Sequence, residues 1–137
     1  MADERDLVRL RTNYRGEDVY LYRLKVTPET VRKVFLDYLL DMNRLKEQPE
    51  WYNALTANCT TSIRQHTVPY NPEARLDWRL INNGYIDQMI YEQGLFSSEL
   101  SFTALKDASY INEKAQAADR SADFSQFIRT GLPILSD

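Results

Sequence analysis

The 137-residue sequence is poor in the residues that build metal sites and disulfides. It contains one cysteine, Cys59, and one histidine, His66. One thiol cannot form an internal disulfide, and one cysteine with one histidine cannot supply the three or four protein ligands of a usual zinc site. We therefore predict no disulfide and no bound metal for this chain, and no cofactor is predicted either.

The sequence also lacks a long apolar run and an excess of basic residues. Its longest apolar stretches fall far short of the ~20 residues that a membrane-spanning helix needs, so no such helix is predicted. The formal net charge is -3 at pH 7, and no basic cluster is dense enough to neutralise a run of phosphates. Nucleic acid is therefore not a predicted partner.

The composition that remains is typical of a globular protein. Hydrophobic residues make up 43% of the chain and charged residues 27%, with only four glycines and five prolines, which excludes the disordered class. A chain of this length usually forms one domain with a core of its own. We predict a single domain over residues 1–137.

The N-terminal part of the chain has the pattern of a β-hairpin. Residues 6–11 and 19–26 are rich in β-branched, aromatic and leucine residues, and the turn-like residues 13–18 separate them. In the second of these segments one set of alternate side chains can pack while the other is partly solvated. The sequence therefore predicts two paired strands.

A long helix is predicted to follow the hairpin. Thr27 is suited to the N-cap and Pro28 to the first helical position, and the helix should end before Pro49. Apolar residues recur at three- and four-residue intervals, which predicts a stripe that packs in the core. The stripe consists of Val31, Val34, Phe35, Tyr38, Leu39, Met42 and Leu45.

The remaining residues are predicted to be mostly helical. Short helices or helical turns are expected at residues 58–66, 80–88, 87–93, 101–108 and 123–129, with Gly84 and Gly94 suited to left-handed caps and Gly131 ending the last helix. Residues 112–120 form either an exposed loop or a helical extension. The predicted fold class is α+β, with an N-terminal β-hairpin followed by a mostly helical region.

Cys59 lies where the helix after Pro49 is predicted to begin. Free backbone amides and the macrodipole at a helix start lower the pKa of a cysteine from its reference value of about 8.5 and favour a nucleophilic thiolate. The Cys59 N–H and the Asn58 side chain would stabilise an oxyanion, with Tyr52, Asn53 and Thr60 lining the site. The alternative is a buried cysteine that fills the core, and the residues alone leave both interpretations open.

A cysteine nucleophile needs a base within about 3 to 3.5 Å. On one continuous helix, His66 would lie about 10 Å from Cys59 along the helix axis. His66 could serve only if the helix ended early and the chain folded back before Pro69. We therefore expect His66 at the surface or in an interface, and the base from elsewhere.

Several motifs resemble the Lnb N-terminal periplasmic domain family of bacterial envelope proteins. The likeness runs from Asp6 through Pro133, and its motifs are Pro49-Glu50-Trp51-Tyr52-Asn53-Ala54-Leu55-Thr56-Ala57-Asn58-Cys59-Thr60-Thr61, Leu76-Asp77-Trp78-Arg79, Gly84-Tyr85 and Tyr91-Glu92-Gln93-Gly94-Leu95.

This family is similar to circularly permuted papain-like thiol enzymes and is associated with N-acylation of lipoproteins. The resemblance implies a periplasmic or cell-envelope location, Cys59 as the nucleophile, and a phospholipid or lipoprotein acyl substrate. It also implies that the chain is the cysteine-bearing fragment of a longer envelope protein. An upstream segment would then supply the catalytic histidine, so the chain alone is expected to be inactive.

Three functions fit these observations. The leading hypothesis is a cysteine-dependent acyltransferase domain of the lipoprotein N-acylation type. A cysteine peptidase or amidase of the cell envelope would use the same residues, because the two reactions differ in whether an amine or water resolves the acyl-enzyme. The third function is a non-catalytic interaction module with Cys59 in its core.

Overall fold

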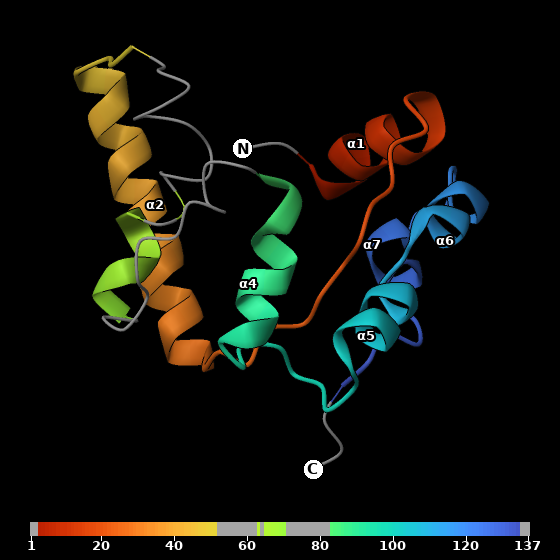
Figure 1. Cartoon of the computed structure of the whole chain (residues 1–137). Coiled ribbons are helices and arrows are strands. Elements are labelled where there is room, and N and C mark those ends of the chain that lie inside the picture. The colour runs from red at the N-terminus through yellow and green to blue at the C-terminus, as the bar shows by residue number, and fades with distance from the viewer. Residues whose placement is uncertain (1–2, 52–62, 64, 71–82, 135–137) are drawn as a thin grey trace. The chain divides into compact units, whose positions relative to one another are not determined.

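The computed structural model describes residues 3–51, 63, 65–70 and 83–134. The chain divides into two compact units (Figure 1). Unit 1 combines Met1–Lys25 with Phe96–Asp137, and unit 2 is Val26–Leu95. Whether the chain is one domain stays a prediction.

Unit 1 begins with helix α1, Glu4–Arg9, which continues directly into a π-helical segment, η1, Leu10–Tyr14. The carboxylate of Asp3 caps α1 by accepting a hydrogen bond from the Arg5 N–H at 2.8 Å, and two acidic residues occupy the first turn, where they interact favourably with the helix dipole. Thr12, 1% exposed, donates from its hydroxyl to the Val8 carbonyl at 3.0 Å.

The predicted β-hairpin, and with it the α+β class, is wrong: the described residues contain helices and only isolated β-bridges. The first predicted strand lies in α1 and η1, so its backbone hydrogen bonds are made within the helix. The second, residues 19–26, contains two isolated antiparallel bridges, Tyr20 with Tyr110 and Leu24 with Phe96. Its partners therefore come from the other end of the chain.

Three short helices complete unit 1: α5 (Phe102–Ala108), α6 (Asn112–Ala117) and α7 (Phe124–Phe127). Figure 1 shows α1 beside α6 and α7, although these elements come from opposite ends of the sequence. The core of unit 1 lies among them, with Val8, Val19 and Leu21 packed against it. It consists of Ile111, Ala115, Ala118, Phe124, Ile128 and Leu132.

The predicted helices in this region are confirmed. The Ser101 hydroxyl caps α5 by accepting from the Ala104 N–H, and Gly131 follows α7 with φ 68°. Of the two alternatives for residues 112–120, the helix is the correct one, because α6 buries Ala115 in the core.

Unit 2 contains α2, Pro28–Glu47, the longest helix that the structure describes. Its predicted start and end are confirmed: the Thr27 hydroxyl accepts from the Thr30 N–H at 3.2 Å, Pro28 takes the first position, and the helix ends before Pro49. Proline fits the first turn because its missing N–H would have no intrahelical partner there.

The face of α2 that is covered is not the predicted apolar stripe. None of its residues is fully buried, and only five are partly buried: Thr30, Val34, Asp37, Tyr38 and Asp41. Val34 and Tyr38 belong to the predicted stripe, whereas the other five apolar residues of that stripe are exposed. The correct helix was therefore predicted with the wrong packing face.

Among the described residues, unit 2 also contains short elements. They include η2 (Val68–Tyr70), η4 (Asn83–Tyr85) and α4 (Ile86–Glu92). Gly94 follows α4 with φ +66° and supplies the predicted left-handed cap. Gly84 instead lies inside η4 and is not left-handed, so that part of the prediction is wrong.

Candidate functional site

The predicted site residues, Cys59 with Asn58, Thr60, Tyr52 and Asn53, lie outside the described residues. Their assignment as nucleophile, oxyanion donor and site lining therefore stays a prediction. The described structure ends before them at Trp51, which is 96% exposed. It resumes after them at Ile63 and continues from Gln65 through His66.

His66 is buried, with 7% of its surface exposed. Its ring packs against Tyr38 of α2 with 4.1 Å between the ring centroids. Its Nε2 atom lies 3.6 Å from Oδ2 of Asp41, which is longer than a hydrogen bond, and no residue that the structure describes forms a hydrogen bond with Nε2. Of the two positions expected for His66, at the surface or in an interface, the surface is wrong, because α2 covers the ring.

Asp41 joins His66 to a chain of charged groups on α2. Its Oδ1 accepts a hydrogen bond from Arg44 Nε at 2.9 Å, and Arg44 also pairs with Glu50 beyond the helix end. The hydrogen bonds from Arg44 to Glu50 and Asp41 raise the pKa of Arg44. The Asp41 carboxylate therefore lies between the permanently charged guanidinium of Arg44 and the imidazole of His66. The hydrogen bond between Asp41 and Arg44 orients these two side chains on α2.

A second polar contact joins residues 65–70 to α2, one helical turn before Asp41. The Tyr70 hydroxyl donates to Oδ2 of Asp37 at 2.8 Å, and this hydrogen bond raises the pKa of Tyr70. Asp37 and Asp41 are four residues apart and so lie on one face of the helix. Residues 65–70 are thus joined to α2 at two points, through His66 and Tyr70.

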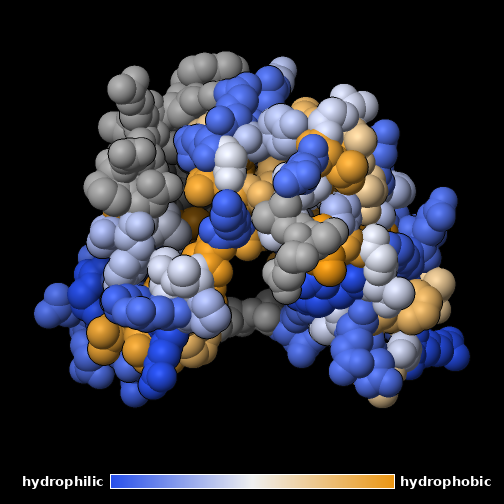
Figure 2. All heavy atoms as spheres, turned by 90° about the horizontal axis from the view of Figure 1, so that it is seen from below, coloured by the Kyte–Doolittle hydropathy of each residue, from blue (hydrophilic) through white to orange (hydrophobic). Residues whose placement is uncertain are grey.

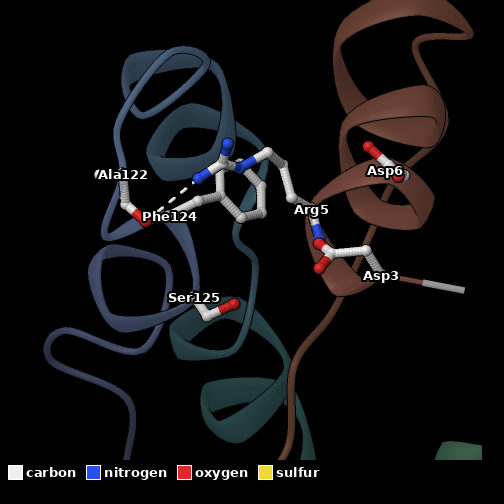
Figure 3. A pocket seen from close by; sticks show the side chains of 6 residues that line it. All are labelled: Asp3, Arg5, Asp6, Ala122, Phe124 and Ser125. Carbon is white, nitrogen blue, oxygen red and sulfur yellow. Dashed lines mark hydrogen bonds between the residues drawn. The ribbon is translucent and has the colours of Figure 1, made fainter.

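Unit 1 contains a small cavity of about 360 Å³ that none of the predicted site residues lines. Figure 3 shows Arg5 reaching from α1 toward the Ala122 carbonyl in this cavity. The Arg5 guanidinium donates to the carbonyls of Ser121 and Ala122 at 2.7 and 3.1 Å, so its charge already serves the fold. Neither a thiol nor an imidazole lines the cavity, and we assign it no chemistry.

Residues 1–84 match the sequence model of the Lnb N-terminal periplasmic domain. The chain belongs to this family. The match includes Cys59, His66 and α2, whereas the Tyr91-Glu92-Gln93-Gly94-Leu95 motif lies outside it. No curated protein and no solved structure matches the chain.

Membership of the Lnb N-terminal domain family places the chain among periplasmic domains, as predicted. In the part of the chain that the structure describes, no helix is long and apolar enough to cross a membrane. Across the same residues, no group of three or more histidine, cysteine, aspartate or glutamate side chains is arranged to hold a metal ion.

Sequence reasoning missed the link between His66 and Asp41. The two residues are 25 positions apart, and no local spacing connects them. The available signal was the four-residue spacing of Asp37 and Asp41, which places two acids close to Tyr38 on one side of a predicted helix. The interpretation of Tyr38 as a core residue was closer, since its ring does pack, against His66.

Proposed function

We propose that this chain is a cysteine-dependent acyltransferase domain of a bacterial cell-envelope protein, of the type that N-acylates lipoproteins, with Cys59 as its nucleophile. The observation that carries the proposal is the family match over residues 1–84, because it spans the only thiol of the chain. The Asn58-Cys59-Thr60-Thr61 segment supports it with donors suited to an anionic intermediate.

The proposed reaction has two steps. The Cys59 thiolate attacks an ester carbonyl of a phospholipid, so that a C–S bond forms, the ester C–O bond breaks, and the lysophospholipid leaves with a proton from the protonated base. The α-amino group of a lipoprotein then attacks the thioester. A C–N bond forms, the C–S bond breaks, the base takes the proton of the amine, and the thiolate is regenerated.

The oxyanion of each tetrahedral intermediate is stabilised by the Cys59 N–H and the Asn58 side chain. Tyr52, Asn53 and Thr60 line the acyl and acceptor positions. The base is a histidine from a segment outside this chain, in a permuted papain-like arrangement. His66 is not assigned this role, because on one continuous helix it would lie about 10 Å from Cys59 along the helix axis.

The chain alone tests whether the thiol is activated. The Cys59 thiolate should react with iodoacetamide in the folded protein below about pH 8, where an ordinary cysteine is mostly protonated. Cys59→Ser is the control for modification elsewhere. A thiol that reacts only when urea unfolds the chain would contradict a nucleophilic role.

Acyl transfer is tested with the longer envelope protein that the resemblance implies, which would include the catalytic histidine. Incubation with phospholipid should add one acyl mass to a peptide that contains Cys59, and hydroxylamine should remove it, as it cleaves thioesters. An acceptor peptide with a free α-amino group should then gain the acyl group. If only hydrolysed product appeared, the peptidase or amidase alternative would replace the transferase.

One observation favours a second candidate, a non-catalytic interaction module. Helix α2 exposes large apolar side chains such as Phe35 and Leu40, which are 52% and 67% exposed, and such surfaces commonly mark interaction sites. The alkylation experiment separates the two candidates, because a module with Cys59 in its core predicts a protected thiol.

A further inference from the structure

Helix α2 carries an exposed apolar face that the proposed chemistry does not use. We define the α2 apolar face as Val31, Phe35, Leu39, Met42 and Leu45, which are 56%, 52%, 36%, 43% and 37% exposed. Spacings of three and four residues place these side chains on one side of the helix. Figure 2 shows hydrophobic side chains at the molecular surface among hydrophilic ones.

The charges on α2 are divided between its two sides. Arg32 and Lys46 lie seven residues before and after Leu39, so they share its side of the helix. Both are exposed, and neither has an ion-pair partner among the residues that the structure describes. The α2 apolar face is therefore bordered by two free cations.

Two acidic residues of α2, Glu29 and Glu47, lie on the other side of Leu39 from Phe35, which we call the acidic side. Asp37 and Asp41 are partly buried on the covered side with Val34 and Tyr38. Two further exposed leucines, Leu36 and Leu40, share this acidic side, at 47% and 67% exposed. Helix α2 thus has one apolar side that carries only cations and a second side on which leucines stand among acids.

We propose that α2 lies flat on an anionic phospholipid bilayer, with the α2 apolar face in the interface and with Arg32 and Lys46 on lipid phosphates. An interfacial helix combines apolar side chains with basic residues at their border, and the long stems of these basic residues reach the headgroups while their methylenes stay in the apolar layer. A bilayer of anionic lipids matches both the hydrophobicity and the charge of this side.

A second copy of the chain fits this face less well. If two α2 helices paired in an antiparallel manner about Leu39, Arg32 of one would meet Lys46 of the other. A parallel pair would place each cation opposite its equivalent. Both arrangements bring like charges together, which is unfavourable, whereas a sheet of phosphates is attractive to every cation.

The test is flotation of the 137-residue chain with two kinds of vesicle, one of phosphatidylcholine alone and one of an equal mixture of phosphatidylcholine and phosphatidylglycerol. We expect binding to the mixed vesicles, weakening as salt is added. Leu39→Gln should lower the partition coefficient at least about tenfold, the size expected for loss of one buried leucine. Leu40→Gln, the same change one residue along on the acidic side, should change it less than about twofold.

The charge part of the proposal has its own matched variants. Arg32→Gln and Lys46→Gln should each weaken binding about fivefold, the fold-change for one basic residue near an anionic surface. Lys33→Gln removes a cation that faces the acidic side and pairs with Glu29 at 2.6 Å, and it should leave binding within about twofold. Circular dichroism checks that each variant keeps its helix content.

Three results would overturn the proposal. The first is absence of binding to the mixed vesicles, and the second is equal loss in the Leu39 and Leu40 variants. The third is a dimer that forms without lipid and is dispersed by Leu39→Gln, which would assign the face to a second copy. Vesicle binding requires no turnover, so these results are independent of whether Cys59 is a nucleophile.

Discussion

At the scale of single residues, His66 is one of the two residues that attach residues 65–70 to α2. Its ring contacts Tyr38 and is almost fully buried, yet its Nε2 has no hydrogen-bond partner in the described part of the chain. A buried polar atom without a partner costs about 1–3 kcal/mol. The ring contact must therefore supply the stabilisation, and we interpret His66 as an anchor rather than a base.

Two substitutions separate these roles of His66. His66→Phe keeps a ring against Tyr38 and removes the unpaired nitrogen, so the free energy of unfolding should stay within about 1 kcal/mol of the wild type. His66→Ala removes the ring and leaves a void, which should cost about 2–3 kcal/mol. Urea denaturation followed by circular dichroism measures both.

The rate of Cys59 alkylation in the same variants provides the functional readout. An anchor predicts that His66→Phe alkylates at the wild-type rate. A large fall in that rate, with stability unchanged, would show that the imidazole itself activates the thiol and would contradict the interpretation of His66 as an anchor.

At the scale of elements, ion pairs join α1 to the C-terminal part of unit 1. The Arg129 guanidinium, just after α7, donates to both carboxylate oxygens of Glu4 at 2.6 and 2.8 Å, and Arg9 pairs with Asp119 at 2.5 Å. The hydrogen bonds from Arg129 hold the pKa of Glu4 below its ordinary value, against a smaller opposing effect of burial. The folded state therefore favours the charged form of this carboxyl.

This lowered pKa gives a pH dependence with a definite sign. A carboxyl whose pKa is lower in the folded state contributes stability above its unfolded pKa and loses it as the pH falls through the folded pKa. Glu4→Gln should lower the free energy of unfolding by up to about 1 kcal/mol at neutral pH, since solvent reaches both side chains (32% and 41% exposed).

The difference between Glu4→Gln and the wild type should shrink as the pH falls below the ordinary glutamate pKa of 4.5 and through the lower pKa of Glu4 in the folded protein, where its carboxyl takes up a proton. Glu99→Gln is the matched control, because it removes the same charge from an exposed position with no ion pair in the described structure. Urea denaturation across this pH range measures both variants. A loss that persisted undiminished at low pH would mean that the ion pair is not its cause.

The elements that the sequence predicted correctly are those with local signals. Thr27, Pro28 and Ser101 mark helix starts by hydrogen bonds or fixed dihedrals within four residues, and Gly94 and Gly131 mark ends by their left-handed backbone. Such interactions depend on neighbours in the chain, so a single sequence contains them.

The β-hairpin was mispredicted because the pairing partner is distant in sequence. Residues 19–26 do extend, and their alternation is real, with Val19 and Leu21 toward the core. Their hydrogen bonds go to Ser109 and Ile111 instead of to residues 6–11: the Leu21 N–H donates to the Ser109 carbonyl at 2.8 Å and the Ile111 N–H to the Val19 carbonyl at 3.1 Å. Periodicity indicates an extended segment but not its neighbour.

In the candidate site too, local features could be predicted from the sequence and contacts between distant residues could not. The motif around Cys59 and the start of α2 are local features and could be found in the sequence. The burial of His66 could not, because it depends on Tyr38 and Asp41 from another element. The packing face of α2 was mispredicted for the same reason. The spacing of apolar residues in the sequence does not show which side of the helix another element will cover.

At the scale of the whole molecule, unit 1 is assembled from both ends of the chain. Its core residues all lie between Ile111 and Leu132, yet Val8 and Val19 pack against them, and the Arg9–Asp119 and Glu4–Arg129 pairs bridge more than 100 residues of sequence. The N-terminal end contributes no residue to this core and only packs on it, so we expect α1 to be stable only together with the C-terminal helices.

Substitution of Ile128 tests this cooperativity. Ile128 is fully buried in the core, whereas Ile134 is 64% exposed. Ile128→Ala should lower the free energy of unfolding by about 2–5 kcal/mol, and Ile134→Ala, the same change at the surface, by less than about 0.5 kcal/mol. Amide hydrogen exchange should show Ile128→Ala weakening protection in α1 as well as in α6 and α7, because α1 packs on the same core. Loss of protection confined to the C-terminal helices would mean that α1 holds its structure independently, and unit 1 would then not be a single cooperative unit.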